Sequence, residues 1–187
     1  MAISLTKGGN VNLSKEAPNL TNMAVGLGWN PRATDGQAFD LDAVAFLVNE
    51  SGKVRTDADF IFFNNLKSSD GSVEHTGDNR TGEGDGDDEV INVDLSRIPA
   101  HVQSLVFTVN SFTGQTFEKV ANAFCRIVNA GNNSEVARYN LSAQGGHTAL
   151  ILAKIYRHNG EWKMHAIGEI ASGRTFHDLM PAITPHA

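Results

Sequence analysis

Short apolar segments recur along the whole chain, and they constrain its fold more than any other feature. Each is rich in β-branched and aromatic residues and is bounded by Gly, Asn, Asp or Ser, the pattern of β-strands separated by turns. Nine or so short strands with little helix predict an all-β chain folded as an antiparallel β-sandwich with one or two short helices. The predicted strands cover residues 22–29, 41–49, 58–63, 90–95, 104–112, 123–129, 135–141, 148–158 and 161–170.

Two turn signals connect predicted strands. Asn159-Gly160 lies between two apolar segments and is the strongest short signal for a hairpin with a type I′ turn. Residues 50–53 indicate a second hairpin, in which antiparallel pairing sets opposite each other residues whose numbers sum to about 105. Helix is expected only as short turns over residues 115–121 and 175–180, the second ended by Pro181.

Length and composition indicate one ordinary globular domain. The chain has 187 residues, enough for a sizeable hydrophobic core, and we expect one domain over residues 1–180 and a loose C-terminal tail over residues 181–187. With an isoelectric point near 5.6 and scattered basic residues, direct nucleic-acid binding is not expected.

The sequence favours a cytoplasmic location. Residues 1–7 lack the pattern of a signal peptide, and no apolar run approaches the roughly 20 residues that a membrane helix needs. The single cysteine, Cys125, cannot form an intrachain disulfide, which fits a reducing compartment.

The stretch from Gly77 to Glu89 concentrates most of the net charge. It contains six acidic residues and one basic residue, Arg80, in a chain whose net charge is -6. Carboxylates this close repel one another, and glycines at 82, 84 and 86 raise the entropic cost of ordering them. A hard divalent cation would offset both costs. Calcium, which takes about six to eight oxygen ligands at roughly 2.3–2.6 Å, is the best candidate.

A second set of oxygen donors is expected at one end of the hairpin around residues 50–53. Asp40 and Asp42 would leave the same face of an extended segment, and the predicted register sets them beside Asn64 and Asn65. Such donors suit calcium or magnesium, not zinc or copper. The candidate metal ligands, enough for more than one ion, are Asp40, Asp42, Asn64, Asn65, Asp78, Asn79, Thr81, Glu83, Asp85, Asp87, Asp88 and Glu89.

Plainer interpretations stay open. Asp-x-Asp at a strand start is often a turn or cap, and this applies still more to Asp57 and Asp59 on the next predicted strand. An acidic, glycine-rich loop is often a solvated connection. The segment is not an EF-hand, because counting from Asp78 puts Glu83 at the sixth position, where Gly is required.

Several stretches together resemble the TerD family of tellurium-resistance and general stress proteins. The resemblance extends over about residues 1–170 and is most specific in the acidic segment. The matching stretches are residues 4–10 (SLTKGGN), 25–29 (VGLGW), 39–43 (FDLDA), 57–65 (DADFIFFNN) and 71–89, which begins GSVEHTGDN.

The resemblance implies a β-sandwich that binds two calcium ions through the acidic segment and neighbouring strand ends. It also implies a cytoplasmic protein that acts with other Ter proteins, including a TerC-type membrane partner that could hold it at the inner face of the membrane. Two departures matter. Asn30 stands where the family usually has Asp, and residues 168–181 are more similar to the TerZ and TerX branch.

Enzymatic interpretations find less support in the residues. No Gly-x-Ser-x-Gly elbow or HExxH pattern is present. His75, nearest the acidic segment, is interpreted as a loop histidine hydrogen-bonded to backbone, and Cys125 as a buried, inert thiol on one face with Ala123 and Ile127. We therefore expect a calcium-binding module that is not an enzyme. The alternatives are a metal-dependent enzyme acting on phosphate-containing small molecules and a stress-induced structural scaffold.

Overall fold

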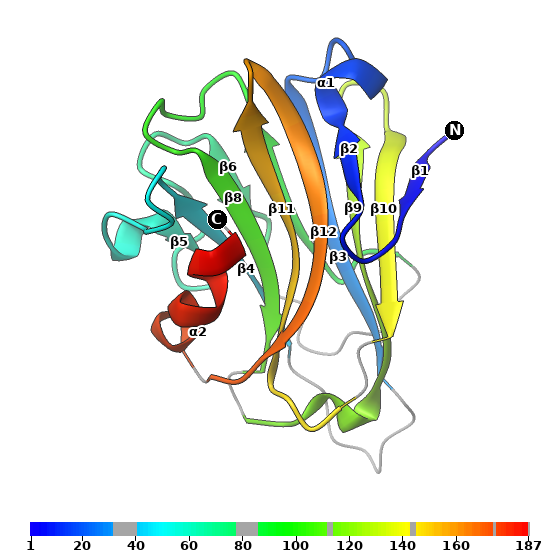
Figure 1. Ribbon diagram of the computed structural model, residues 1–187, viewed down its shortest axis with the longest axis vertical. Helices are drawn as coiled ribbons and strands as arrows, with labels where there is room; N and C mark the ends of the chain where they lie inside the picture. The colour runs from blue at the N-terminus through cyan, green and yellow to red at the C-terminus, as the bar shows by residue number, and fades with distance from the viewer. Residues whose placement is uncertain (32–40, 78–85, 112–113, 143–144, 174, 187) are drawn as a thin grey trace.

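The computed structural model describes residues 1–31, 41–77, 86–111, 114–142, 145–173 and 175–186. Two six-stranded sheets pack face to face as a sandwich (Figure 1). The first sheet has the order β1-β10-β9-β3-β7-β6. Its strands are β1 (Ile3–Leu5), β10 (Ser134–Ser142), β9 (Val120–Asn129), β3 (Asn22–Pro31), β7 (Glu89–Asp94) and β6 (Val73–His75).

The second sheet has the order β2-β12-β11-β8-β4-β5. Its strands are β2 (Asn10–Asn12), β12 (Glu161–Ala171), β11 (Ala149–His158), β8 (Ser104–Asn110), β4 (Asp42–Val48) and β5 (Phe60–Ile61). All neighbouring strands run antiparallel except β1, which lies parallel to β10. The predicted antiparallel β-sandwich is confirmed.

The predicted hairpins are also present. Asn159 and Gly160 join β11 to β12 and both have positive φ, 52° and 77°, as a type I′ turn requires. In the hairpin around residues 50–53, Ala45 faces Ile61 and Phe46 faces Phe60, within one residue of the predicted register.

The residues expected to form a strand over 58–63 are only partly extended. Asp57–Asp59 form a 3-10 helix, η1, and β5 covers Phe60–Ile61 alone. The backbone N–H of Arg55 donates to the Asp59 carboxylate at 3.0 Å and stabilises this turn. Asp57 and Asp59 therefore lie in a turn, the plainer of the interpretations left open for them.

The main core lies between the sheets, and a second apolar cluster lies on the outer face of the second sheet. Alternation along β4 divides its side chains between the two: Ala43 and Ala45 belong to the main core, whereas Val44 and Phe46 belong to the outer cluster. Helix α2 (Phe176–Ile183) covers this outer cluster with its buried Leu179 and Ile183 (Figure 1).

Helix is sparse, as predicted, and comprises α1 (Leu13–Glu16), α2 and the 3-10 helices η1, η2 (Phe117–Lys119) and η3 (Thr184–His186). Thr175 and Asp178 form a capping box that begins α2. The prediction that Pro181 ends the helix is wrong. α2 continues to Ile183, whose buried side chain holds the last turn against the sheet, and the expected loose tail is thus partly helical.

The first residues of the chain join both sheets along one side. β1 lies at an edge of the first sheet and β2 at an edge of the second. Between them, Gly8 has a φ of 80°, and its N–H donates to the carbonyl of Ala166. These three-residue strands and β6 went unpredicted because a segment so short shows no readable alternation.

Candidate functional site

The acidic segment enters β7 through three consecutive carboxylates, Asp87, Asp88 and Glu89. Their side chains are attached to three different parts of the sandwich. The remaining candidate ligands of the acidic segment, together with Asp40, lie outside the described residues: Asp78, Asn79, Thr81, Glu83 and Asp85. The described carboxylates therefore define how this segment is held where it joins the fold.

Asp87 is held by Arg126 of β9 on the outer face of the first sheet. The Arg126 Nε donates to Oδ1 at 2.7 Å, and its Nη2 donates to Oδ2 at 2.9 Å. Glu135 of β10 accepts from Nη1 at 3.1 Å. Hydrogen bonds with Asp87, followed by those with Glu135, raise the pKa of Arg126 further above its ordinary value, so this guanidinium stays charged.

Asp88 is half-buried against β3. Its Oδ2 accepts from the backbone N–H of Trp29 at 2.7 Å, and its own N–H donates to the carbonyl of Leu27 at 2.9 Å. Burial raises the pKa of this carboxyl to about 6, with smaller contributions from the negative charges of Glu89 and Asp87. A nearby cation would lower this pKa again.

Glu89 is buried and links the two sheets. Its Oε2 accepts from the backbone N–H of Ala43, on β4 of the second sheet, at 2.7 Å and lies 3.0 Å from His75 Nε2. Because the N–H of Gly77 donates to His75 Nδ1 at 3.1 Å, the neutral ring carries its proton on Nε2 and donates it to Glu89. The predicted backbone hydrogen bond of His75 is confirmed, but the residue belongs to β6 and is buried.

The structure places Asp42, Asn64 and Asn65 differently from the predicted ladder. Asp42 is buried, and its neighbour across the sheet is Asn110 of β8. Asn65 pairs with Phe62 in a turn, and its Nδ2 donates to the carbonyl of Phe60 at 2.7 Å. The second strand therefore ends at Ile61 and does not extend to the level of Asp42, while Asn64 is exposed.

The described donors fit a hard cation by type but do not form a complete site. The side chains of Asp42, Asn64, Asp87, Asp88 and Glu89 all carry oxygen atoms, the ligands that calcium prefers. Both oxygens of Asp87, Oδ2 of Asp88 and Oε2 of Glu89 already accept hydrogen bonds. Within the described ranges, no three His, Cys, Asp or Glu side chains lie close enough together to hold one metal ion.

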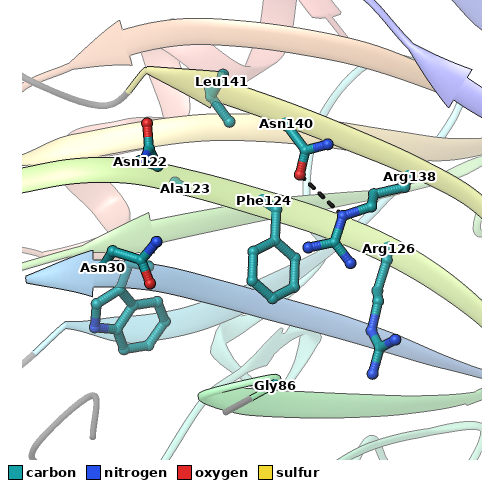
Figure 2. A pocket seen from close by; sticks show the side chains of 10 residues that line it. Asn30, Gly86, Asn122, Ala123, Phe124, Arg126, Arg138, Asn140 and Leu141 are labelled. Atoms are coloured by element: carbon teal, nitrogen blue, oxygen red, sulfur yellow. Dashed lines mark hydrogen bonds between the residues drawn. The ribbon is translucent and has the colours of Figure 1, made fainter. Parts of the chain in front are cut away.

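A polar groove of about 450 Å³ lies beside this segment on the outer face of the first sheet (Figure 2). The Arg138 guanidinium lies over the Phe124 ring, 4.1 Å from its centroid, and its Nε donates to Asn140 at 2.9 Å. Arg126 and Gly86 line the same groove, together with Trp29, Asn30, Asn122, Ala123 and Leu141.

Sequence reasoning missed Arg126, whose side chain donates to both carboxylate oxygens of Asp87 in the acidic segment. The available signal was the pair Gly26 and Gly28, two residues apart in an apolar strand, because glycine in a strand often marks a close approach. A Cβ on Gly26 would collide with the Asp87 carboxylate, and one on Gly28 would collide with the Phe124 ring.

Cys125 agrees with its predicted role. Its side chain is buried with those of Ala123 and Ile127 in the main core. Burial raises the pKa of its thiol to about 12, so the reactive thiolate is scarce at neutral pH. Among the described helices, none is long and apolar enough to cross a bilayer.

Comparison with known proteins assigns the family. The TerD domain matches residues 1–180. Tellurium resistance protein TerD of Serratia marcescens is 55% identical over 178 residues, 92% of this chain and 93% of the relative. TerZ of the same organism is 47% identical over 95% of this chain and 94% of the relative, and general stress protein 16U of Bacillus subtilis (strain 168) is 47% identical over 90% of each.

A solved structure shows the same fold. The Streptomyces coelicolor A3(2) protein described as a homologue of telluride resistance protein (TerD) superimposes with a TM-score of 0.66, at 21% identity, over 83% of this chain and 92% of that one. The chain belongs to the TerD domain family, whose members include tellurium-resistance and stress-response proteins.

Proposed function

We propose that this protein is a calcium-binding module of the tellurium-resistance and stress response, and that it acts by binding and not by catalysis. The observation that carries the proposal is the acidic segment itself: carboxylates alternate with glycine over residues 82–87, and the segment ends in three carboxylates anchored to the sandwich. A bound cation would offset the repulsion between these charges and order the segment.

The anchored end supports this role by its geometry. Asp88 and Glu89 are tied to backbone N–H groups of Trp29 and Ala43, which belong to different sheets. The segment is therefore attached to both layers of the rigid part of the fold, and positions fixed in this way preorganise a binding site. In the described part of the site the donors are oxygen atoms, which favours calcium over softer metals.

We further propose that the calcium-loaded segment is the surface that other Ter proteins recognise, including a TerC-type membrane partner. The support is the family relationship, together with the charge change that calcium would cause at this surface. The free, buried Cys125 supports a cytoplasmic location. Pull-down of candidate partners with and without Ca²⁺ tests the first of these statements.

Calorimetry and thermal unfolding test calcium binding directly. After treatment with a chelator, Ca²⁺ is expected to bind measurably and to stabilise the fold by about 2.7 kcal/mol at a hundredfold excess over Kd. Mg²⁺ should have little effect, and Asp78→Ala and Glu83→Ala should abolish the response. A chelator-treated protein whose melting temperature does not respond to Ca²⁺ would contradict the proposal.

A further inference from the structure

Among the described residues, Arg126 is the basic side chain that contacts the acidic segment. It lies on β9, and Asp87 lies two residues before β7; β3 separates these two strands in the sheet. The Arg126 side chain is 29% exposed, whereas that of Asp87 is 12% exposed. A two-point contact of this kind fixes direction as well as distance, because both carboxylate oxygens are held by one planar group.

The strand surface beneath Asp87 also fits this carboxylate closely. Gly26 of β3 is the cross-strand neighbour of Arg126, and its missing side chain leaves the space that the Asp87 carboxylate occupies. Glu135 holds the guanidinium from its other side, and Arg138 in turn contacts Glu135 at 3.4 Å. Asp87 thus lies over Gly26 of β3 and is bound by Arg126 of β9, which is itself held by Glu135 of β10.

We propose that Arg126 is a positioning residue for cation binding: it fixes Asp87 on the sheet and so places the adjoining carboxylate of Asp88. This inference rests on the proposed function. Asp87 thereby serves as an anchor whose negative charge is neutralised by Arg126. Partners of this kind, which orient metal ligands without touching the metal, typically change affinity by about 10–100-fold when removed.

The positive charge of Arg126 and its role as an anchor predict opposite effects of its removal on the affinity for Ca²⁺, which makes the inference testable. Removing a positive charge beside an anionic site would strengthen cation binding if only electrostatics mattered. Loss of the anchor would weaken it. Arg126→Met is therefore expected to raise the Kd for Ca²⁺ by about tenfold or more, and Arg126→Lys, which keeps the charge but loses the planar two-point contact, should also raise it.

Gly26→Ala provides an independent test that changes no charge. Its methyl group would displace the Asp87 carboxylate, so the Kd for Ca²⁺ is expected to rise as in Arg126→Met. Gly28→Ala is the matched control. It makes the same change on the same face of β3, but its methyl group meets the Phe124 ring instead of the acidic segment, and its Kd should stay within about twofold of the parent.

The experiment is calorimetric titration of the chelator-treated, full-length parent and variants with CaCl₂, with amide hydrogen exchange measured in parallel. Exchange at Asp88, whose N–H donates to Leu27, reports the anchor without metal, and it should rise at least about tenfold in Arg126→Met and Gly26→Ala but not in Gly28→Ala. A parent that binds Ca²⁺ with variants that bind equally well would overturn the positioning role alone.

If the parent binds no Ca²⁺, the proposed function fails, and the positioning of cation ligands by Arg126 fails with it. Hydrogen exchange then decides whether Arg126 still anchors the segment structurally. Tighter binding by Arg126→Met would show that charge outweighs position and would also overturn the inference.

Discussion

At the scale of single residues, neighbouring carboxylates in one short segment have different environments. Asp87 is paired with a guanidinium, Asp88 accepts a backbone N–H, and Glu89 accepts two buried donors. The sequence identified all three as candidate ligands but could not tell them apart, because their partners Arg126, Trp29 and Ala43 lie 39 to 59 positions away in the chain.

The raised pKa of Asp88 predicts a pH dependence of stability. In the metal-free protein the folded state binds a proton more tightly than the unfolded state, so stability should fall as the pH rises from about 4 through 6. Asp88→Asn keeps an acceptor for Trp29 N–H and removes the charge. Its melting temperature in chelator should exceed that of the parent at pH 7.5, and the difference should vanish near pH 4.

The matched control for this measurement is Asp94→Asn. Asp94, at the other end of β7, accepts from Ser96 in an exposed setting. The same change there should not reproduce the gain at pH 7.5. A parent whose melting temperature rises steadily between pH 4 and 7 relative to Asp88→Asn would refute the assignment.

At the scale of elements, sequence patterns located the long strands well and the short ones poorly. Each of the nine predicted segments contains a strand, because several β-branched and aromatic residues in a row, bounded by turn residues, are a readable signal. β1, β2 and β6 went unpredicted because they have only three residues each. The 3-10 helix η1 stands where the strand over residues 58–63 was expected to begin, because the hydrogen bond from Arg55 N–H to Asp59 depends on local side-chain geometry. α2 continues beyond Pro181, where it was expected to end, because burial of Ile183 offsets the backbone hydrogen bond that a proline inside a helix removes.

Helix α2 should contribute strongly to stability through Leu179. This side chain is fully buried in the outer cluster, so Leu179→Ala is expected to lower the free energy of unfolding by about 2–4 kcal/mol. Leu66→Ala is the same change at a side chain that is 44% exposed and should cost less than about 0.5 kcal/mol. Urea denaturation measures both, and similar costs would mean that α2 is not packed as described.

At the scale of the whole molecule, Glu89 connects the two layers of the sandwich. Glu89→Ala would leave two buried donors, Ala43 N–H and His75 Nε2–H, without this acceptor, so we expect a loss of about 2–4 kcal/mol of unfolding free energy even in chelator. Glu74 lies on β6, the neighbour of β7, and Glu74→Ala, which removes an exposed ion pair with Lys67, should cost no more than about 1 kcal/mol. Equal losses in urea denaturation would argue against the cross-sheet role.

The sequence could identify the residues of the acidic segment but not their arrangement in the fold. Clustered acids and glycines identified the acidic segment without any knowledge of the fold. β4 pairs with β8 on one side and β5 on the other, and β5 ends at Ile61, so only β8 reaches the level of Asp42. Where β5 ends could not be predicted from the residues of the hairpin alone.

The pairing of β1 and β2 constrains the order in which the strands can join the two sheets during folding. Ile3–Leu5 can add only to a sheet that already contains residues 134–142, and Asn10–Asn12 only beside residues 161–171. Residues 3–12 must therefore wait for strands more than 100 positions further along the chain before they can close the seam between the layers, and partners that far apart in the chain slow folding.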